Sequence, residues 1–133
     1  LSGTLPEAWS SYASLWYIGA QRNSFTGTLP LSWASLPSIR AMRLDRNQFS
    51  GTVPDVWSSL SNLQILYIDD NQLVGTLPAS WSAMTSLYDI FVSENQLTGT
   101  IPESWTTFPN MKYMRFYDCL FTGTIPESFN SMT

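Results

Sequence analysis

The sequence contains no histidine, a single cysteine and few charges, and each scarcity excludes a class of function. Without histidine, no Ser-His-Asp or Cys-His nucleophile can be assembled, and the commonest metal ligand is missing. Six basic residues stand against ten acidic ones, so the net charge is -4 and there is no basic face to neutralise phosphates. We therefore expect no enzymatic activity, no cofactor, no metal and no nucleic-acid partner.

Long hydrophobic runs are also missing. No segment approaches the ~20 apolar residues that cross a bilayer, so we expect no membrane insertion by this stretch of chain. The opening residues, LSGTLPEAW, lack the charged and then apolar pattern of a signal peptide. Charged residues make up only 12% and hydrophobic residues 44% of the 133 positions, which predicts one folded domain rather than disorder.

What the sequence does contain is a repeat. The tetrapeptide Gly-Thr-(Leu/Val/Ile)-Pro recurs at a constant step without any insertion, beginning at Gly3, Gly27, Gly51, Gly75, Gly99 and Gly123. Aligning the chain on this 24-residue step places apolar residues in columns, one of which is Ile18, Met42, Leu66, Ile90 and Met114. Self-similarity at this spacing, combined with a recurring asparagine, is typical of leucine-rich repeats.

The alternation around residues 65–69 predicts a short half-buried strand in every coil. Leu66 and Ile68 point inward there, while Ile65, Tyr67 and Asp69 point outward. Such strands stack in parallel about 4.8 Å apart. We expect a right-handed leucine-rich repeat solenoid with a parallel concave sheet, and a convex side of turns, 3-10 segments and short strands such as residues 26–29. Residues 1–133 would form a single array of about five and a half repeats. Because neither end has the capping pattern that array ends need, we expect it to be a segment of a longer array.

An asparagine column follows the concave strands. A buried amide satisfies backbone groups of its own and adjacent coils, which predicts a structural ladder. Its members are Asn23, Asn47, Asn71, Asn95 and, one step further, Cys119. Because the chain has no histidine to act as the activating base, the thiol of Cys119 is interpreted as a core residue rather than a nucleophile.

Five tryptophans also recur in register, which predicts a packing column. They are Trp9, Trp33, Trp57, Trp81 and Trp105. Trp16 lies outside this column and is the tryptophan expected to be exposed.

The outward residues of the concave strands, which are predicted to include Asp45 and Asp89, vary from coil to coil, as a recognition surface would. Tyr67 and Phe91 should be neighbours in adjacent strands, flanked by arginines, and this is the composition that binding hot spots favour. The candidate ligand-binding residues are Arg43, Tyr67, Asp69, Phe91, Tyr113, Arg115 and Tyr117. The alternative is that aromatic residues suit exposed strands through cross-strand pairing alone.

Two further columns have a functional and a structural interpretation. Asp70, Glu94 and Asp118 could hold a calcium ion, but a solvated rim explains them as well. The repeated Thr-x-Thr array resembles ice-binding surfaces, but hydroxyl residues also belong to the ordinary repeat. We favour the structural interpretation of both.

The stretch LxGTLPxxW resembles the plant-type leucine-rich repeat, with Trp where plant repeats place Leu. The phrase GTLPASWSAMTSL, residues 75–87, is similar to repeats of the promastigote surface antigen and proteophosphoglycan families of trypanosomatid parasites. This resemblance implies a cell-surface or secreted protein that engages a host protein through its concave face. A plant-type receptor ectodomain that binds a peptide or co-receptor, and a structural spacer or immune decoy, are the alternatives.

Overall fold

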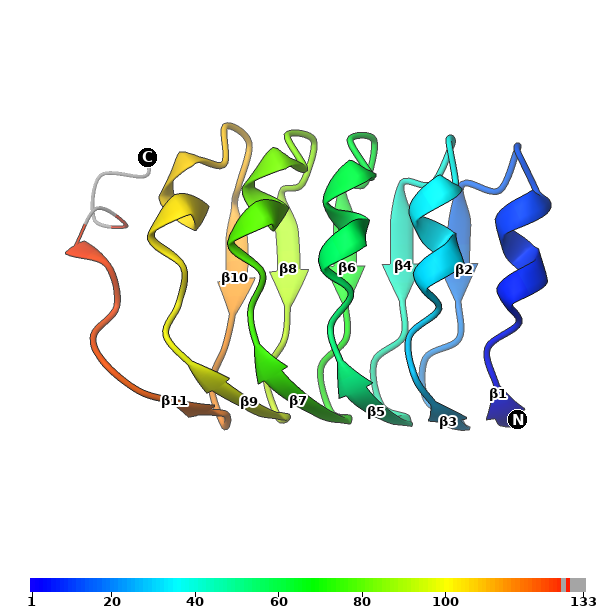
Figure 1. Ribbon diagram of the computed structural model, residues 1–133, viewed down its shortest axis with the longest axis horizontal. Coiled ribbons are helices and arrows are strands. Elements are labelled where there is room, and N and C mark those ends of the chain that lie inside the picture. The colour runs from blue at the N-terminus through cyan, green and yellow to red at the C-terminus, as the bar shows by residue number, and fades with distance from the viewer. Residues whose placement is uncertain (128, 130–133) are drawn as a thin grey trace.

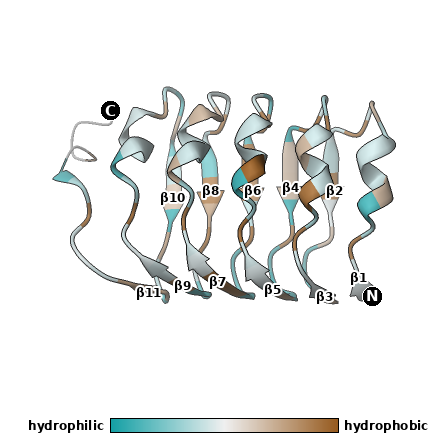
Figure 2. Ribbon diagram, in the orientation of Figure 1, coloured by the Kyte–Doolittle hydropathy of each residue, from teal (hydrophilic) through white to brown (hydrophobic). Residues whose placement is uncertain are grey.

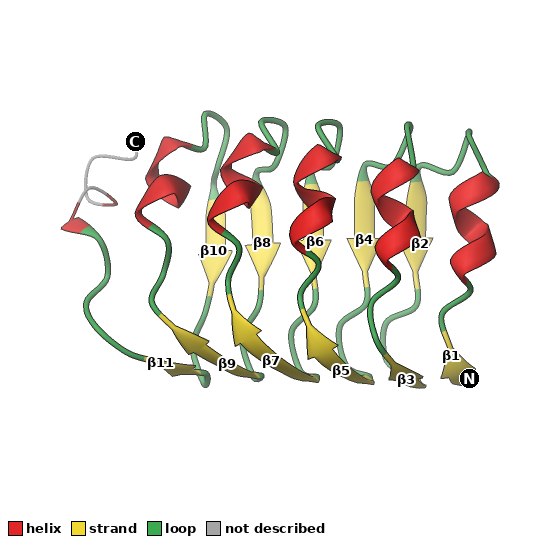
Figure 3. Ribbon diagram, viewed as in Figure 1, coloured by secondary structure: helices red, strands yellow, loops and turns green. Residues whose placement is uncertain are grey.

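The computed structural model describes residues 1–127 and residue 129, and it shows a row of stacked coils in which the first and last described strands, β1 and β11, lie at opposite ends of the row (Figure 1). Each complete coil contains a strand, a turn, a second strand and a short helix (Figure 3). The constant 24-residue step explains this regularity, because every coil places the same residue types at the same points.

The first strands of the coils form a five-stranded parallel sheet, the concave sheet, in the order β10-β8-β6-β4-β2. Its strands are β2 (Tyr17–Gly19), β4 (Ala41–Arg43), β6 (Ile65–Tyr67), β8 (Asp89–Phe91) and β10 (Tyr113–Arg115). Residues 24 positions apart pair directly, as Tyr67 does with Phe91. The predicted strand at 65–69 therefore exists, but it ends at Tyr67, although the Ile68 amide still donates to the Phe91 carbonyl at 2.9 Å.

A second parallel sheet, of six strands, runs along one edge of the coils in the order β1-β3-β5-β7-β9-β11. Its strands are β1 (Ser2–Thr4), β3 (Ser24–Gly27), β5 (Gln48–Thr52), β7 (Gln72–Thr76), β9 (Gln96–Gly99) and β11 (Leu120–Phe121). Paired residues are 22 positions apart, as in Thr76 and Thr98. The sequence placed such a strand at residues 26–29, which was too late, because β3 begins at Ser24 and ends at Gly27.

In the described residues, five 3-10 helices complete the convex side. They are η1 (Glu7–Ser11), η2 (Leu31–Ser35), η3 (Asp55–Ser59), η4 (Ala79–Ala83) and η5 (Glu103–Thr107). A proline precedes each helix, for example Pro78 with φ -69° and ψ 122° before η4. Proline fixes φ and lacks a backbone donor, so it ends the preceding extended segment and starts the helix.

The glycine of the repeat is required by both backbone conformation and space. Gly75 adopts φ 83°, a left-handed conformation that side chains disfavour. A Cβ atom there would also lie 3.0 Å from the Thr52 methyl group of the preceding coil. The coils can therefore stack closely at this corner only with glycine.

The tryptophan column forms the convex half of the core. Trp33, Trp57, Trp81 and Trp105 are each 0% exposed, and Trp9 is partly buried against the same core. Neighbouring indoles are stacked nearly parallel, with ring centroids 6.4 Å apart for Trp33 and Trp57. Each buried indole Nε1 donates to a proline carbonyl of the previous coil, as Trp81 does to Pro54 at 3.0 Å. The predicted packing role is confirmed for the four buried rings, and Trp16 is 62% exposed as expected.

The asparagine column forms a ladder of hydrogen bonds between coils. The Asn71 Nδ2 atom donates to the Ile68 and Asp69 carbonyls of its own coil at 3.1 Å and to the Leu44 carbonyl of the previous coil at 3.2 Å. Its Oδ1 atom accepts from the Phe49 amide at 3.0 Å. Asn47 and Asn95 repeat the same pattern, and Asn23 repeats the bonds within its own coil.

Cys119 occupies the next position of this ladder, but it is only partly buried. Its thiol donates to the Val92 carbonyl at 3.4 Å, the same contact across 27 positions that Asn95 makes to Ile68. The interpretation as a core residue therefore needs correction, since the thiol packs against the core from its boundary. Burial raises the pKa of the Cys119 thiol, which disfavours the nucleophilic thiolate.

We expect Trp81→Ala to lower the free energy of unfolding by about 3 to 5 kcal/mol, because it removes a fully buried ring. The measurement is urea unfolding of the whole chain. Trp16→Ala is the control, because its exposed ring should contribute little. Equal losses from the two variants would contradict the packing role.

We expect Asn71→Ala to cost roughly 2 to 4 kcal/mol, because it leaves buried backbone groups of two coils without partners. Asn71→Cys should be milder, since a thiol at this position keeps one contact of the kind Cys119 makes. Thermal unfolding of both variants tests this order, and equal melting losses would argue against the ladder.

Candidate functional site

Four side chains on the concave sheet form one continuous stack across β4, β6, β8 and β10. The Tyr67 and Phe91 rings lie parallel, with centroids 4.2 Å apart and planes 4° apart. The Arg43 guanidinium covers the other face of Tyr67 at 4.9 Å, and the Arg115 guanidinium covers the other face of Phe91 at 4.1 Å. In Figure 2, β4, β8 and β10 each have a hydrophilic segment at one end and paler or hydrophobic residues along the rest of the strand. The sequence predicted that these four residues lie together, and the 24-residue register brings them together.

The stack determines which groups a partner can touch. Both faces of both rings are covered, so a ligand cannot stack on Tyr67 or Phe91. Ring edges and guanidinium N–H groups remain available. Cation–π contacts of this kind hold the arginine planes in place, which reduces the entropy that binding would otherwise cost.

Asp89, two residues before Phe91 on β8, is buried, although the alternation of β8 predicted an outward residue. The Tyr67 hydroxyl donates to the Asp89 carboxylate from the adjacent strand. Burial and this bonded carboxylate raise the pKa of Tyr67 to about 12, and burial raises the pKa of Asp89. The carboxylate thus positions the ring instead of presenting itself to a partner.

A cavity of about 140 Å³ opens beside the stack, between the concave strands and the turns that follow them. Its walls are Arg22, Arg43, Asp45, Arg46, Tyr67, Asp69, Phe91 and Arg115. Asp45, which the sequence also placed outward, is only 5% exposed. Its Oδ1 atom lies 3.6 Å from Arg43 Nε, an ion pair beyond hydrogen-bond distance. The Oδ1 atoms of Asp45 and Asp69 have no hydrogen-bond donor within the described residues.

Burial, and then the neighbouring charge of Asp45, raise the pKa of Asp69 to about 6. Two carboxylates from adjacent coils thus share a partly dehydrated space without a donor for each oxygen. The sequence predicted Asp69 as a site residue but gave no sign of this shift, which depends on the coils being stacked.

The turn after each concave strand places one charged residue in a left-handed conformation. These residues are Arg22, Arg46, Asp70, Glu94 and Asp118, with φ between 49° and 57°. All five are exposed, so the first two coils present positive charge and the next three negative charge. Asp70 lies 4.0 Å from Arg46, and in the described part of the chain no group of three or more acidic or thiol residues could hold a metal ion.

Tyr113 and Tyr117, the other predicted site residues, lie outside the cavity. Both are exposed on or just after β10, and the Tyr117 hydroxyl donates to Glu94 at 3.4 Å. They extend the concave surface toward the last coils without joining the stack.

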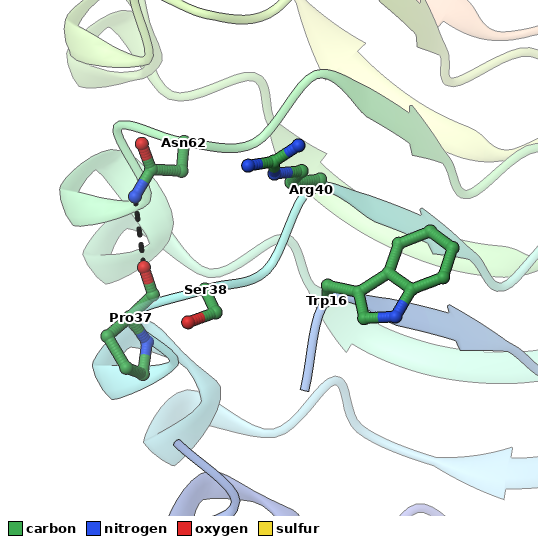
Figure 4. A pocket seen from close by; sticks show the side chains of 5 residues that line it. All are labelled: Trp16, Pro37, Ser38, Arg40 and Asn62. Carbon is green, nitrogen blue, oxygen red and sulfur yellow. Dashed lines mark hydrogen bonds between the residues drawn. The ribbon is translucent and has the colours of Figure 1, made fainter. Parts of the chain in front are cut away.

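A second hollow, of about 410 Å³, lies at the edge where the chain enters the concave strands, and sequence reasoning missed it. Figure 4 shows its lining residues, Trp16, Pro37, Ser38, Arg40 and Asn62. Asn62 Nδ2 donates to the Pro37 carbonyl at 2.9 Å and closes one side. Trp16 and Arg40 share one column of the repeat, which could have signalled an exposed polar and aromatic edge.

The threonine array lies on the second sheet, and its side chains serve the packing of the coils. The Thr26, Thr98 and Thr122 hydroxyls donate to glycine carbonyls of the previous coil at 3.3 to 3.4 Å. Glutamines pair with members of this array, as Gln72 does with Ser50. The array therefore includes residues other than threonine, and its threonine hydroxyls are hydrogen-bonded to the backbone of the neighbouring coil.

Known proteins support this fold. A family model described as Leucine Rich Repeat matches residues 62–84 and 110–132. The chain is a leucine-rich repeat solenoid. No curated protein matches it significantly.

Solved structures extend the likeness to the whole repeat array. The plant peptide hormone receptor RGFR1 in complex with RGF2 is 32% identical with a TM-score of 0.95, over 97% of this chain and 21% of the receptor. The Arabidopsis receptor kinase HAESA, in complex with the peptide hormone IDA and the co-receptor SERK1, is 30% identical with a TM-score of 0.93. The match covers 99% of this chain and 22% of that chain. A plant ice-binding protein shares the fold, with 23% identity and a TM-score of 0.76. That match covers 91% of this chain and 39% of the ice-binding protein. The array spans about a fifth of the two receptors.

The raised pKa of Asp69 predicts that acid stabilises the array at this residue. The folded-state pKa is raised from 3.8 to about 6, so the folded chain binds this proton more tightly than the unfolded chain does. The stabilisation that comes from protonating Asp69 is fully present below pH 3.8 and is lost as the pH rises through about 6. Asp69→Asn should therefore stabilise the array by about 1 kcal/mol at neutral pH, after allowance for solvent screening, and by less in acid.

Thermal unfolding of the wild type and Asp69→Asn across this pH range measures the effect. Asp118→Asn is the matched control, because its carboxylate is exposed in the equivalent loop of a later coil. A stability difference between wild type and Asp69→Asn that does not change with pH would contradict the assignment.

Proposed function

We propose that this leucine-rich repeat array is a non-enzymatic module that recognises an extracellular protein partner through its concave sheet. The observation that carries the proposal is the preordered Arg43–Tyr67–Phe91–Arg115 stack, which presents aromatic edges and fixed guanidinium groups on a rigid sheet. Aromatic and arginine side chains dominate protein-binding hot spots, and a fixed geometry lowers the cost of association.

The similar ectodomains support the same proposal. RGFR1 and HAESA are each described in complex with a peptide hormone, HAESA also with a co-receptor. Related structures are described as ectodomains of plant receptor kinases. None of the helices in the described part of the present chain has the length and apolarity that a bilayer crossing needs.

We assign the array to a cell-surface or secreted protein, and its source family is a finer proposal. The Trp-Ser column supports a parasite surface antigen that engages host macromolecules. The structural likeness supports a plant-type receptor ectodomain as the second candidate. Both candidates use the concave surface, whereas a spacer or decoy would need no preordered stack.

The test begins with extracellular proteins that the immobilised array captures, each then titrated against variants. We expect Phe91→Ala/Arg115→Ala to weaken binding of the true partner by more than about 1 kcal/mol, because the stack loses its outer half. The double variant Leu31→Ala/Val56→Ala is the matched control, since both residues are exposed on the convex helices. If only the convex variant loses the partner, recognition lies on the convex side and the proposal is wrong.

A further inference from the structure

The charged residues of the turns form one row, the turn edge, whose sign changes once along the array. Its members, one from each coil, are Arg22, Arg46, Asp70, Glu94 and Asp118. Their side chains are exposed, but the backbone of each turn is bonded to the next coil. The Arg46 amide donates to the Asp69 carbonyl at 3.0 Å, and the Asp70 amide donates to the Ser93 carbonyl at 3.1 Å. The coil stacking therefore holds successive charges in place, about 4.8 Å apart.

The first two coils carry the positive end of the turn edge. Although the net charge of the chain is -4, all but one of its arginines line the cavity beside this end, namely Arg22, Arg43, Arg46 and Arg115. Asp45 is buried and paired with Arg43, so the charges that these two turns expose are the Arg22 and Arg46 guanidinium groups. Guanidinium binds carboxylates through charge-assisted hydrogen bonds, which predicts an acidic group on the partner at this end.

The last three coils carry the negative end of the turn edge. Arg46 pairs with Asp70 at 4.0 Å, which marks the change of sign, and within the described residues no ion pair involves Glu94 or Asp118. The Tyr117 hydroxyl donates to Glu94 at 3.4 Å but brings no positive charge. Two exposed carboxylates one coil apart without a counter-charge attract cations, so a partner should carry a basic group at this end.

Segregated charge costs the free array stability, because charges of one sign on neighbouring coils repel each other. Alternating signs along the turn edge would have replaced this repulsion with attraction. A partner that carries the opposite pattern relieves the repulsion at both ends together, and a partner of one sign relieves it at one end only. The turn edge is therefore complementary to a partner whose own charges are segregated.

We propose that the turn edge binds an extended polypeptide segment with acidic residues over the first two coils and basic residues over the last three. This inference rests on the recognition function proposed above and specifies the chemistry of the partner. The row from Arg22 to Asp118 covers four coil steps, about 19 Å, and an extended chain rises about 3.3 Å per residue, so about six residues span it. Because the turn amides are already bonded within the array, side-chain charges make the contact and either chain direction fits.

The probes are blocked hexapeptides without aromatic residues, titrated into the whole chain at low salt and followed by NMR of the backbone amides. Glu-Glu-Gly-Ser-Lys-Lys and Lys-Lys-Gly-Ser-Glu-Glu have segregated charge, Glu-Lys-Gly-Ser-Glu-Lys has the same composition with mixed charge, and Lys-Lys-Gly-Ser-Lys-Lys is all basic. We expect at least one segregated peptide to bind in the millimolar range, about fivefold tighter than the mixed peptide, which is the factor that two exposed ion pairs supply. Added salt should weaken its binding.

Two double variants test which residues set this preference. Arg22→Glu/Arg46→Glu makes the whole turn edge negative, so the all-basic peptide should now bind tighter than either segregated one. Arg40→Glu/Lys112→Glu is the matched control, because it changes the net charge equally at exposed residues that directly precede concave strands. This control should leave the segregated peptide ahead of the mixed one.

Equal binding of segregated and mixed peptides, or no binding of either segregated peptide, overturns the inference whether or not a variant folds. An unchanged preference in Arg22→Glu/Arg46→Glu overturns it too. A second copy of the array also carries both charges, so sedimentation at low salt is measured, and a dimer that this variant dissociates would assign the turn edge to self-association instead. Any of these failures leaves the proposed function standing, because that function is judged by the loss of a captured protein from Phe91→Ala/Arg115→Ala.

Discussion

The hydrogen bonds of the asparagine column are the interaction on which the rest of this structure depends. Each concave strand ends after three residues, and the chain must then turn with its backbone groups buried. One amide, such as Asn71, supplies donors and an acceptor to both its own coil and the previous one. The ladder fixes the distance and register between coils, and every column on the concave sheet inherits that register.

The side chains of the candidate site lie together because the concave strands of neighbouring coils pair in a fixed register. Tyr67 and Phe91 stack because they are 24 residues apart, and the arginines of the neighbouring coils then cover the outer ring faces. The same stacking forces Asp45 and Asp69 together and raises the pKa of Asp69. A slip of one residue in any coil would turn its side chains to the other face and remove both features.

The columns could be predicted because they depend on local and periodic chemistry. Trp81 recurs with Trp57 and Trp105, so its packing role follows from the step alone, and Asn71 follows from the same argument. Outward residues were less predictable. Asp45 and Asp89 alternate correctly for exposure, yet they are only 5% and 7% exposed. Asp45 is paired with Arg43 of its own coil, and Asp89 accepts a hydrogen bond from Tyr67 of the adjacent strand. Cys119 has the right column but lies at the boundary of the core.

The sequence by itself determined the solenoid, the coil length, the buried columns and the adjacency of Arg43, Tyr67, Phe91 and Arg115. These properties follow from periodicity, because identical coils must pack identical positions together. Only the tertiary structure decided that the ring faces are covered, that the Oδ1 atoms of Asp45 and Asp69 have no hydrogen-bond donor among the described residues and that four arginines line one cavity. Those features depend on the directions in which the long side chains of different coils extend toward one another. A sequence pattern does not specify those directions.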